Sequence, residues 1–561
     1  MTPSPDSTPS TDPPAAGALE GLLGRCAAAL DAAAGYESRL RAALRRAIAP
    51  AGTVEPDRLE RHQFAAHGFA WVATYVEALH RLLDWASGLA AAGRAGEREA
   101  LILEIAFAEY LAQLAGGIAL APGEIVRPGD FGPDGSAAAR LLDPAAALFP
   151  KGATGRRERL CVLLAEGGCG EIGGLGEALD LFRDELRRFV VARVLPQAPL
   201  WHEADRLIPL DLIAELAALG VFGVTVAEES GGLGLGRLAM CVVSEELSRG
   251  SLALGSLGTR SEIAAELIGR SGTAEQRARY LPGIAGGAIL PTAVFTEPGA
   301  GSDLAAVTTK AVRAGGAWRV SGAKTWITHG ARSDLMTLLV RTGSEPGHRG
   351  LSILLADKPR GSEAEPFPAP GMSGSEIRVL GYRGMKEYEI AFDGFAVPEE
   401  GLLGGRPGEG FRQLMATFET ARIQTASRAV GVAQNALDLA LAYAAERRQF
   451  GRPIAAFPRV SGKLGWMAAE TMLARQLAYH AAREKDRGRR CDIVAGMAKL
   501  LAARVAWSNA DNGVQIHGGN GYALEYPISR VLLDARILAI FEGAAEIQAQ
   551  VIARGLLEAR N

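Results

Sequence analysis

Several features that would point to a nucleic acid or a membrane are missing from this sequence. Lys plus Arg number 60 against 63 for Asp plus Glu, so no large positive field is available to attract a nucleic acid. No apolar run reaches the roughly 18 residues of a membrane span. The first residues, MTPSPDSTPSTDPPAAG, have neither a basic start nor an apolar stretch, so they do not resemble a signal peptide. We therefore expect no nucleic-acid partner and no membrane span.

Cysteine is also scarce. The five cysteines are scattered over 561 residues, and none belongs to a CxxC pair. Neither a zinc site nor a disulfide framework is indicated, and we predict no metal. This use of cysteine fits a reducing cytoplasm, which is the localisation we expect. The five are Cys26, Cys161, Cys169, Cys241 and Cys491.

Apolar residues make up 48% of the chain, enough for a large core, and their pattern divides it into five parts. Residues 1–17 are rich in Pro, Ser and Thr, which predicts a disordered tail. Helical spacing predicts a helical extension over 18–172 and a second helical domain over 173–290. Short β-rich segments predict an antiparallel β domain over 291–407, and long helical periods predict a four-helix bundle over 408–561. The fold class is therefore α+β and mostly helical.

One glycine-rich segment, SGGLGLG (230–236), invites comparison with a dinucleotide-binding loop. Such a loop should follow a buried strand and open a helix within a βαβ unit. Here a helical pattern follows, but only the short VFGVTV precedes it. The segment favours a plain helix-entry loop over a dinucleotide site.

Five motifs stand out in the last two thirds of the chain, about residues 175 to 561: FTEPGAGSDL (295–304), KTWIT (324–328), ERRQFGRPI (446–454), VQIHGGNGYALEYPISRVLLDARI (514–537) and IFEGAAEIQ (540–548). With these motifs, this part of the chain resembles the acyl-CoA dehydrogenase family. The resemblance implies that family's architecture: an N-terminal helical domain, a middle β domain and a C-terminal four-helix bundle, here preceded by an extra helical extension. It also implies an FAD cofactor and an acyl-CoA substrate.

The last motif places a lone carboxylate, Glu542, between apolar residues and a run of small ones that begins at Gly543. Removing a proton α to a thioester carbonyl needs a carboxylate base, and burial would raise its pKa toward the ~6–7 typical of such bases. By itself, Glu542 would also fit a carboxylate stabilised at a helix N-terminus. The resemblance implies that Glu542 is the base, that its backbone N–H holds the thioester oxygen and that Gly543 leaves room for the substrate. Some relatives carry the base where this chain has Ala421, which cannot serve.

The resemblance also implies residues that contact the flavin. Phe295, Thr296 and Ser302 would line the flavin and the thioester end of the substrate. Trp326 would cover one flavin face, and Thr328 would hydrogen-bond near the reactive ring nitrogen. From the residues alone, a turn cluster and an ordinary core tryptophan remain open as alternatives.

A second group matches residues that bind the cofactor of a neighbouring subunit. Arginine suits this task because its planar fork pairs with phosphate. Exposed charges at a helix end are the alternative. The group consists of Arg447, Phe450, Gln515, Gly518 and Gly519.

The chain departs from the family pattern at two cofactor positions. His329 stands where relatives commonly have Asn, which would alter the flavin edge or the acyl pocket. Ala544 stands where many relatives have a cofactor-contacting Thr, whereas Glu546 keeps its expected place in the cofactor site.

The implied reaction is removal of the α-proton by Glu542 with hydride transfer from the β-carbon to FAD, which an electron-transferring flavoprotein would reoxidise. A dicarboxylic acyl chain would need a cation, because burying its distal carboxylate unpaired is costly. Arg260, Arg422 and Arg383 are the candidates, with surface ion pairs as the alternative. A glutaryl or short branched-chain substrate, an acyl-CoA oxidase and a non-catalytic flavoprotein remain open.

The extension echoes the bundle in two places. FAWVATYVEAL (69–79) is similar to LGWMAAETMLA (464–474), and AQLAGG (112–117) to VQIHGG (514–519). The extension could thus be a degenerate bundle copy that covers the surface through which many relatives form tetramers, leaving a homodimer. Chance similarity between Ala-rich helices is the alternative.

Overall fold

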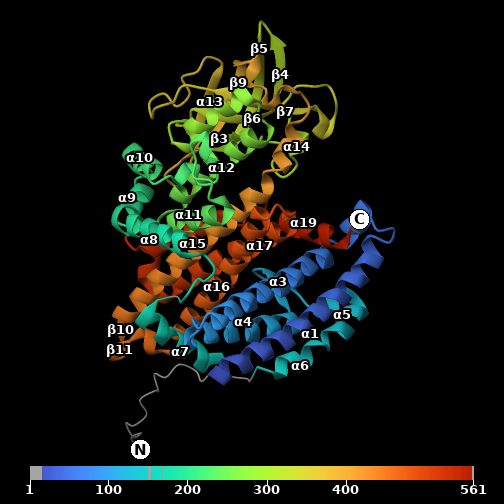
Figure 1. Ribbon diagram of the computed structural model, residues 1–561, viewed down its shortest axis with the longest axis vertical. Coiled ribbons are helices and arrows are strands. Elements are labelled where there is room, and N and C mark those ends of the chain that lie inside the picture. Colours follow the sequence, from blue (N-terminus) through green and yellow to red (C-terminus); the bar gives the residue numbers. More distant parts are fainter. Residues whose placement is uncertain (1–15, 150–152, 169, 559–561) are drawn as a thin grey trace, which may run out of the picture. The chain divides into compact units, whose positions relative to one another are not determined.

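The computed structural model describes residues 16–149, 153–168 and 170–558, drawn as ribbons in Figure 1. They form two compact units. The first takes in the chain up to residue 174, residues 444–476 and the chain end from residue 556; the second takes in residues 175–443 and 477–555. Apart from its last two residues, the predicted tail 1–17 lies outside the described residues.

The extension in the first unit is built from long helices with a shared apolar core. Residues 69–89 lie within α3, where Phe69, Trp71, Tyr75 and Trp85 are buried, whereas Phe64 near its start is exposed. The rings of Tyr75 and Tyr110 pack with centroids 4.3 Å apart. The elements are α1 (Ala16–Ile48), α2 (Pro56–Arg61), α3 (Gln63–Ala91), α4 (Glu97–Gly116), β1 (Ile118–Ala121), β2 (Glu124–Val126), α5 (Gly132–Ala139), α6 (Leu142–Ala147) and α7 (Ala153–Gly167).

The same unit includes the first part of helix α16 (Pro458–Asp486), up to residue 476. The Trp466 ring of α16 lies 5.8 Å from the ring of Tyr110, and the Tyr110 hydroxyl donates to Glu470 at 3.1 Å. The guanidinium of Arg157, on α7, stacks over Trp466 at 5.2 Å. The extension therefore packs directly on this segment of α16.

The second unit begins with a helical domain. The glycine-rich segment 230–236 follows short 3₁₀ turns and leads straight into α11, so it is a helix-entry loop as predicted. Thr273 caps α13 by accepting from the Gln276 backbone N–H at 3.2 Å, and the Gln276 side chain accepts from Thr273 in return. The helices are α8 (Glu177–Phe189), α9 (Ala198–Glu203), α10 (Leu210–Ala218), α11 (Gly236–Gly250), α12 (Leu252–Ser271) and α13 (Ala274–Ala285).

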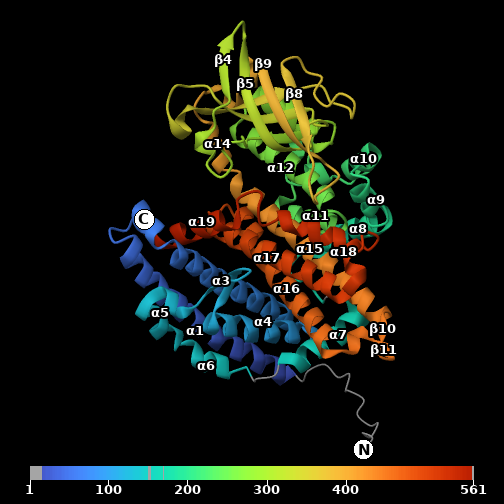
Figure 2. The same ribbon diagram turned by 180° about the vertical axis from the view of Figure 1, so that it is seen from behind.

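A seven-stranded sheet follows, in the order β3-β6-β4-β5-β9-β8 with β7 paired to β6. Figure 2 shows β4, β5, β9 and β8 across this sheet. The sheet is mostly antiparallel as predicted, but β6 pairs in parallel with β3 and, at one position, with β4. In the β5–β9 pairing Thr328 stands opposite Glu387. The strands are β3 (Pro291–Val294), β4 (Lys310–Ala314), β5 (Ala317–Thr328), β6 (Leu335–Arg341), β7 (Leu351–Asp357), β8 (Met372–Ile377) and β9 (Glu387–Pro398).

The C-terminal helices are more divided than a plain four-helix bundle. The helical stretch 410–446 is interrupted at Ala416 and Thr417, where the Thr417 hydroxyl donates to the Leu414 carbonyl at 2.8 Å. A further helix begins at Pro527, a residue suited to the first helical position. The helices are α14 (Gly410–Met415), α15 (Phe418–Glu446), α16, α17 (Asp492–His517), α18 (Pro527–Ile537) and α19 (Ala545–Leu557).

Two features are absent from the described residues. No helix there is both long and apolar enough to cross a membrane. No group of three or more His, Cys, Asp or Glu side chains in that part of the chain could hold a metal ion.

Candidate active site

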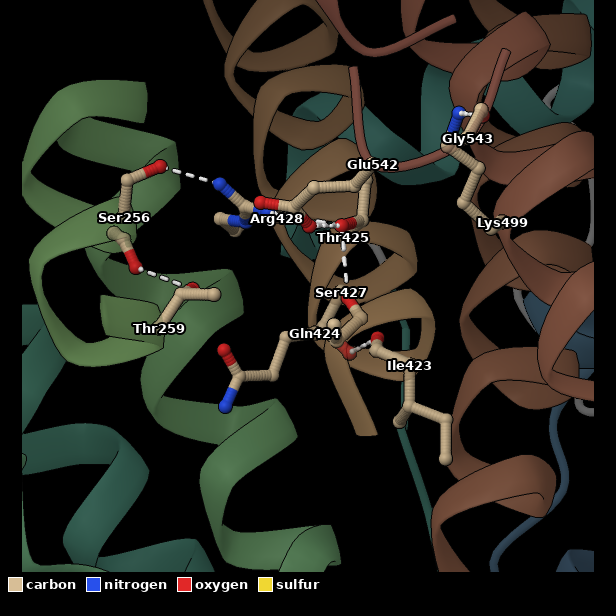
Figure 3. Close-up of polar contacts among 12 residues, drawn as sticks. Ser256, Thr259, Ile423, Gln424, Thr425, Ser427, Arg428, Lys499, Glu542 and Gly543 are labelled. Carbon is tan, nitrogen blue, oxygen red and sulfur yellow. Dashed lines mark hydrogen bonds and ion pairs between the residues drawn. The ribbon is translucent and has the colours of Figure 1, made fainter. Parts of the chain in front are cut away.

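Glu542 lies in the loop between α18 and α19, and several contacts hold this loop in place (Figure 3). Its backbone is left-handed, with φ at +52°, and Gly543 follows at +93°. The Lys499 ammonium of α17 donates to the Gly543 carbonyl at 2.5 Å, and the Gln548 amide donates to the Glu542 carbonyl at 3.4 Å. These bonds stabilise a conformation that a non-glycine residue rarely adopts.

The Glu542 carboxylate is surrounded by polar groups from other helices. The Thr425 hydroxyl and the Arg428 Nη2 atom of α15 both donate to Oε2, the latter at 2.6 Å. Arg260 Nη1, from α12, lies 3.6 Å from Oε1. Among the described residues Oε1 has no hydrogen-bond partner. Only 14% of the side chain is exposed and Oε1 itself is buried, so the carboxylate is largely shielded from water.

The prediction that Glu542 has a raised pKa is wrong. Burial does act to raise the pKa, but the charges of Arg428 and Arg260 and the hydrogen bonds from Thr425 and Arg428 outweigh it. The pKa therefore lies below the usual 4.5 of a glutamate. Opposite charges at hydrogen-bonding distance favour the ionised form, so Glu542 is a carboxylate at neutral pH.

Arg428 is the residue that the sequence reasoning missed. Its side chain is fully buried, contacts the Ser256 hydroxyl and lies 5.0 Å over the Phe541 ring. A signal was available: this arginine stands among small and apolar residues of a buried helix. An arginine placed there is almost never fully buried without a partner.

Of the three candidate arginines, Arg260 is the one found beside Glu542. Its Nη2 atom donates to the Thr328 hydroxyl at 3.3 Å and to the Tyr382 hydroxyl at 3.4 Å. Arg422 stacks over the Phe418 ring at 5.9 Å. Arg383 donates to backbone carbonyls, including that of His202 at 3.1 Å. The three side chains therefore have different surroundings.

The predicted flavin residues frame an open surface at the end of β5. Trp326 is 56% exposed with a left-handed backbone, whereas Thr328 is buried. The carbonyls of Phe295 and Thr296 accept from Lys324 at 2.9 Å and from the Thr325 backbone at 3.0 Å. Ser302 lies exposed in the same loop. An uncovered tryptophan beside a backbone-rich loop fits a planar, hydrogen-bonding ring such as a flavin.

The residues predicted to reach a neighbouring subunit's cofactor are exposed. In the first unit these are Arg447 and Phe450, the latter 91% exposed with φ at +51°. In the second unit Gln515, Gly518 and Gly519 are exposed at the end of α17. A side chain as apolar and as exposed as Phe450 fits a surface that something covers.

The remaining positions singled out in the sequence all lie in the second unit. Ala544 and Glu546 lie at the start of α19, where Glu546 is exposed. His329 is buried, and in the described part of the chain both of its ring nitrogens lack partners. Burial and the nearby cations, Arg332 first among them, lower its pKa to about 3, so the imidazole is neutral. Ala421 is buried and offers no carboxylate.

A largely buried carboxylate, an exposed tryptophan at the end of β5 and the order helices–sheet–helices fit the arrangement of an acyl-CoA dehydrogenase. Models of the acyl-CoA dehydrogenase N-terminal, middle and C-terminal domains match residues 176–288, 292–395 and 408–557, and the chain belongs to this family. The predicted fold class is confirmed. The chain is an oxidoreductase that acts on an acyl-CoA and uses FAD.

Individual relatives sharpen the comparison. The chain is 58% identical to "(2S)-methylsuccinyl-CoA dehydrogenase" of Cereibacter sphaeroides over 92% of its own length and 95% of that protein. It is 34% identical to a glutaryl-CoA dehydrogenase of Desulfococcus multivorans, covering 69% of this chain and 98% of the relative. The solved butyryl-CoA dehydrogenase of Megasphaera elsdenii superposes with a TM-score of 0.65 at 30% identity, covering 69% of this chain and 99% of that one.

Proposed function

We propose that this protein oxidises (2S)-methylsuccinyl-CoA to mesaconyl-CoA, a step of the ethylmalonyl-CoA pathway. The 58% identity to a dehydrogenase of that name over almost the whole chain supports the assignment. The single structural observation that carries it is Arg260, a buried cation beside the catalytic carboxylate. A dicarboxylic acyl chain needs such a cation inside an otherwise dry pocket.

In this reaction Glu542 takes the proton from the carbon next to the thioester carbonyl. Arg428 and Thr425 occupy Oε2, so Oε1 is the oxygen that accepts the proton. FAD, when bound, accepts the hydride from the neighbouring carbon. The backbone N–H of Glu542 would donate to the thioester oxygen, because the fixed loop holds it in a set direction.

The other predicted site residues complete the proposal. Trp326 and Thr328 face the flavin, with Phe295, Thr296 and Ser302 along its edge. Arg260 holds the distal carboxylate, assisted by Arg422 and Arg383 where the acyl chain reaches them. An electron-transferring flavoprotein is the electron acceptor.

We infer further that the protein is a cytoplasmic homodimer. The extension packs on residues 444–476 of the bundle through Tyr110, Trp466 and Arg157. A surface covered in this way is closed to a second dimer. Light scattering should give a dimer for the full chain and a larger assembly after deletion of residues 1–165; an unchanged dimer contradicts the idea.

The substrate is tested by anaerobic bleaching of the bound flavin with methylsuccinyl-, succinyl-, glutaryl-, butyryl- and isobutyryl-CoA. Methylsuccinyl-CoA should bleach the flavin fastest. A clear preference for butyryl-CoA would contradict the dicarboxylic assignment. A preference for glutaryl-CoA would support the alternative that the protein is a glutaryl-CoA dehydrogenase. A flavin that no thioester bleaches would indicate a non-catalytic flavoprotein, and oxygen consumption without another acceptor would indicate an oxidase.

A further inference from the structure

A second buried carboxylate, Glu387, stands close to the catalytic cluster although the reaction does not require it. It is the first residue of β9 and is 6% exposed. Its Oε2 atom accepts from the Thr328 hydroxyl at 3.0 Å. The same hydroxyl accepts from Arg260 at 3.3 Å. Thr328 therefore links Glu387 to the cation that we assign to the substrate.

Above pH 7 the ammonium of Lys499 largely loses its charge, because burial lowers its pKa to about 7, and the charges in this cluster then balance before substrate arrives. Arg260 and Arg428 are its two guanidinium groups, and Glu542 and Glu387 are its two carboxylates. A dicarboxylic acyl group would bring a third carboxylate into the same dry region. One uncompensated buried charge is costly, so the cluster either rejects such a substrate or takes up a proton.

Three other titratable groups lie near this cluster. His329, at the end of β5, is neutral because its pKa is lowered to about 3. The Tyr382 phenol is a hydrogen-bonding partner of Arg260. Lys499 is bound to the Gly543 carbonyl, and Figure 3 draws it on the far side of Glu542 from Ser256.

We propose that Glu387 takes up a proton when a dicarboxylic thioester binds, which offsets the charge of the distal carboxylate as it pairs with Arg260. This inference rests on the proposed function. The proton comes from solvent and adds to a Glu387 oxygen, so the neutral acid replaces the carboxylate while the substrate keeps its charge. Glu387 is thereby a specificity residue. Its carboxylate balances the charge of the buried Arg260 in the free protein, and the distal carboxylate of the substrate balances that charge in the complex.

The ordinary titration of Glu387 suits this role. Burial raises its pKa to about 7, while the bond from Thr328 and the charge of Arg260 act in the other direction. A second carboxylate on Arg260 removes part of that lowering and adds repulsion, so the pKa rises further on binding. Above pH 7 the free protein carries an ionised Glu387 and must gain a proton; at pH 6 Glu387 is already neutral.

The test uses the FAD-loaded protein and two unsaturated thioesters that cannot reduce the flavin: mesaconyl-CoA, with a distal carboxylate, and crotonyl-CoA, without one. Titration calorimetry at pH 8 in two buffers of different ionisation enthalpy counts the protons exchanged. Binding of mesaconyl-CoA should make the protein take up about one proton more than binding of crotonyl-CoA does at pH 8. At pH 6 the difference should be almost zero. The affinity of mesaconyl-CoA relative to crotonyl-CoA should fall about tenfold between pH 7 and pH 8.5.

Two variants complete the test. Glu387→Gln should abolish the extra proton, whereas Glu389→Gln, at an exposed position of the same strand, should leave it unchanged. Equal proton counts for the two thioesters overturn the inference in the wild-type protein, whether or not the variant folds. An extra proton that survives Glu387→Gln but disappears in Lys499→Met also overturns it. A preference for crotonyl-CoA would instead contradict the proposed function itself.

Discussion

Helices α4 and α17 end in similar sequences but use their glutamines differently. In the extension, the Gln113 side chain accepts from the Tyr75 hydroxyl at 2.6 Å. In the second unit, which holds Glu542 and is called the catalytic unit below, Gln515 is exposed at the corresponding helix end. In both helices the following glycine caps the helix by donating back to the glutamine carbonyl. The two helices therefore end with a similar backbone hydrogen bond, but only the Gln515 side chain is exposed and available for a ligand.

The same contrast holds for charged groups. The extension pairs Arg156 with Glu104 at 3.0 Å and Arg159 with Glu97 at 2.6 Å, all partly exposed. Such pairs contribute little to stability, typically about 0–1 kcal/mol. Around Glu542 the charges are buried, and breaking one pair leaves another group unpaired. The extension therefore resembles a scaffold, whereas the catalytic unit keeps charges that a substrate can rearrange.

The largest expected effect comes from removing the carboxylate that distinguishes the catalytic unit. Glu542→Gln should slow flavin reduction by a thioester about 10³–10⁴-fold, because the α-proton then has no acceptor. Stopped-flow absorbance measures the rate, and the visible spectrum shows whether the flavin is still bound. Reduction at the wild-type rate would contradict the assignment of the base.

A smaller but more selective effect is expected at Arg260. Arg260→Met should lower kcat/KM for methylsuccinyl-CoA about 10²–10³-fold by leaving the distal carboxylate unpaired. Turnover of butyryl-CoA should change much less. Arg270→Met, an exposed arginine of the same helix, is the matched control. Equal losses with both substrates would mean that Arg260 serves the base and not the acyl chain.

The pH profile distinguishes a base held ionised from one held neutral. Since the Glu542 pKa lies below 4.5, the kcat/KM of the wild type should not decline as pH falls until below that value. Arg428→Gln removes the strongest lowering influence and should move this acid limb upward by about one pH unit or more. An acid limb that does not move would show that Arg428 does not set the ionisation of the base.

The smallest effects are expected from replacing Gln113 and Gln515, the two glutamines compared above. Gln113→Ala should lower the stability to urea by about 1 kcal/mol through loss of the Tyr75 bond, with unchanged flavin content. Gln515→Ala should weaken FAD retention and leave the urea midpoint almost unchanged. Equal behaviour of the two variants would remove the distinction between scaffold and cofactor site.

Local sequence patterns predicted the helices and strands, and also those site residues that belong to a recognisable motif. The helical spacing of the bundle, the short β segments and the FEGAAEIQ motif each depend on neighbouring residues. Tertiary partners do not leave such a pattern: Arg428 meets Glu542 from 114 positions away. The raised pKa was wrong for this reason, because burial was visible in the motif while the compensating arginines were not. Glu387 reaches the cluster only through strand register opposite Thr328.

The position of Thr425 has a consequence for how this active site can evolve. Thr425 donates to the Glu542 carboxylate, and its hydroxyl oxygen lies 2.8 Å from the Ala421 carbonyl, so Ala421 stands one helical turn from the residue that contacts Glu542. An acid at 421 would approach the same pocket, and glycine at 542 would adopt the left-handed backbone without strain. Paired substitution at these two sites is therefore a short mutational path along which the catalytic acid can migrate between helices while the reaction is conserved.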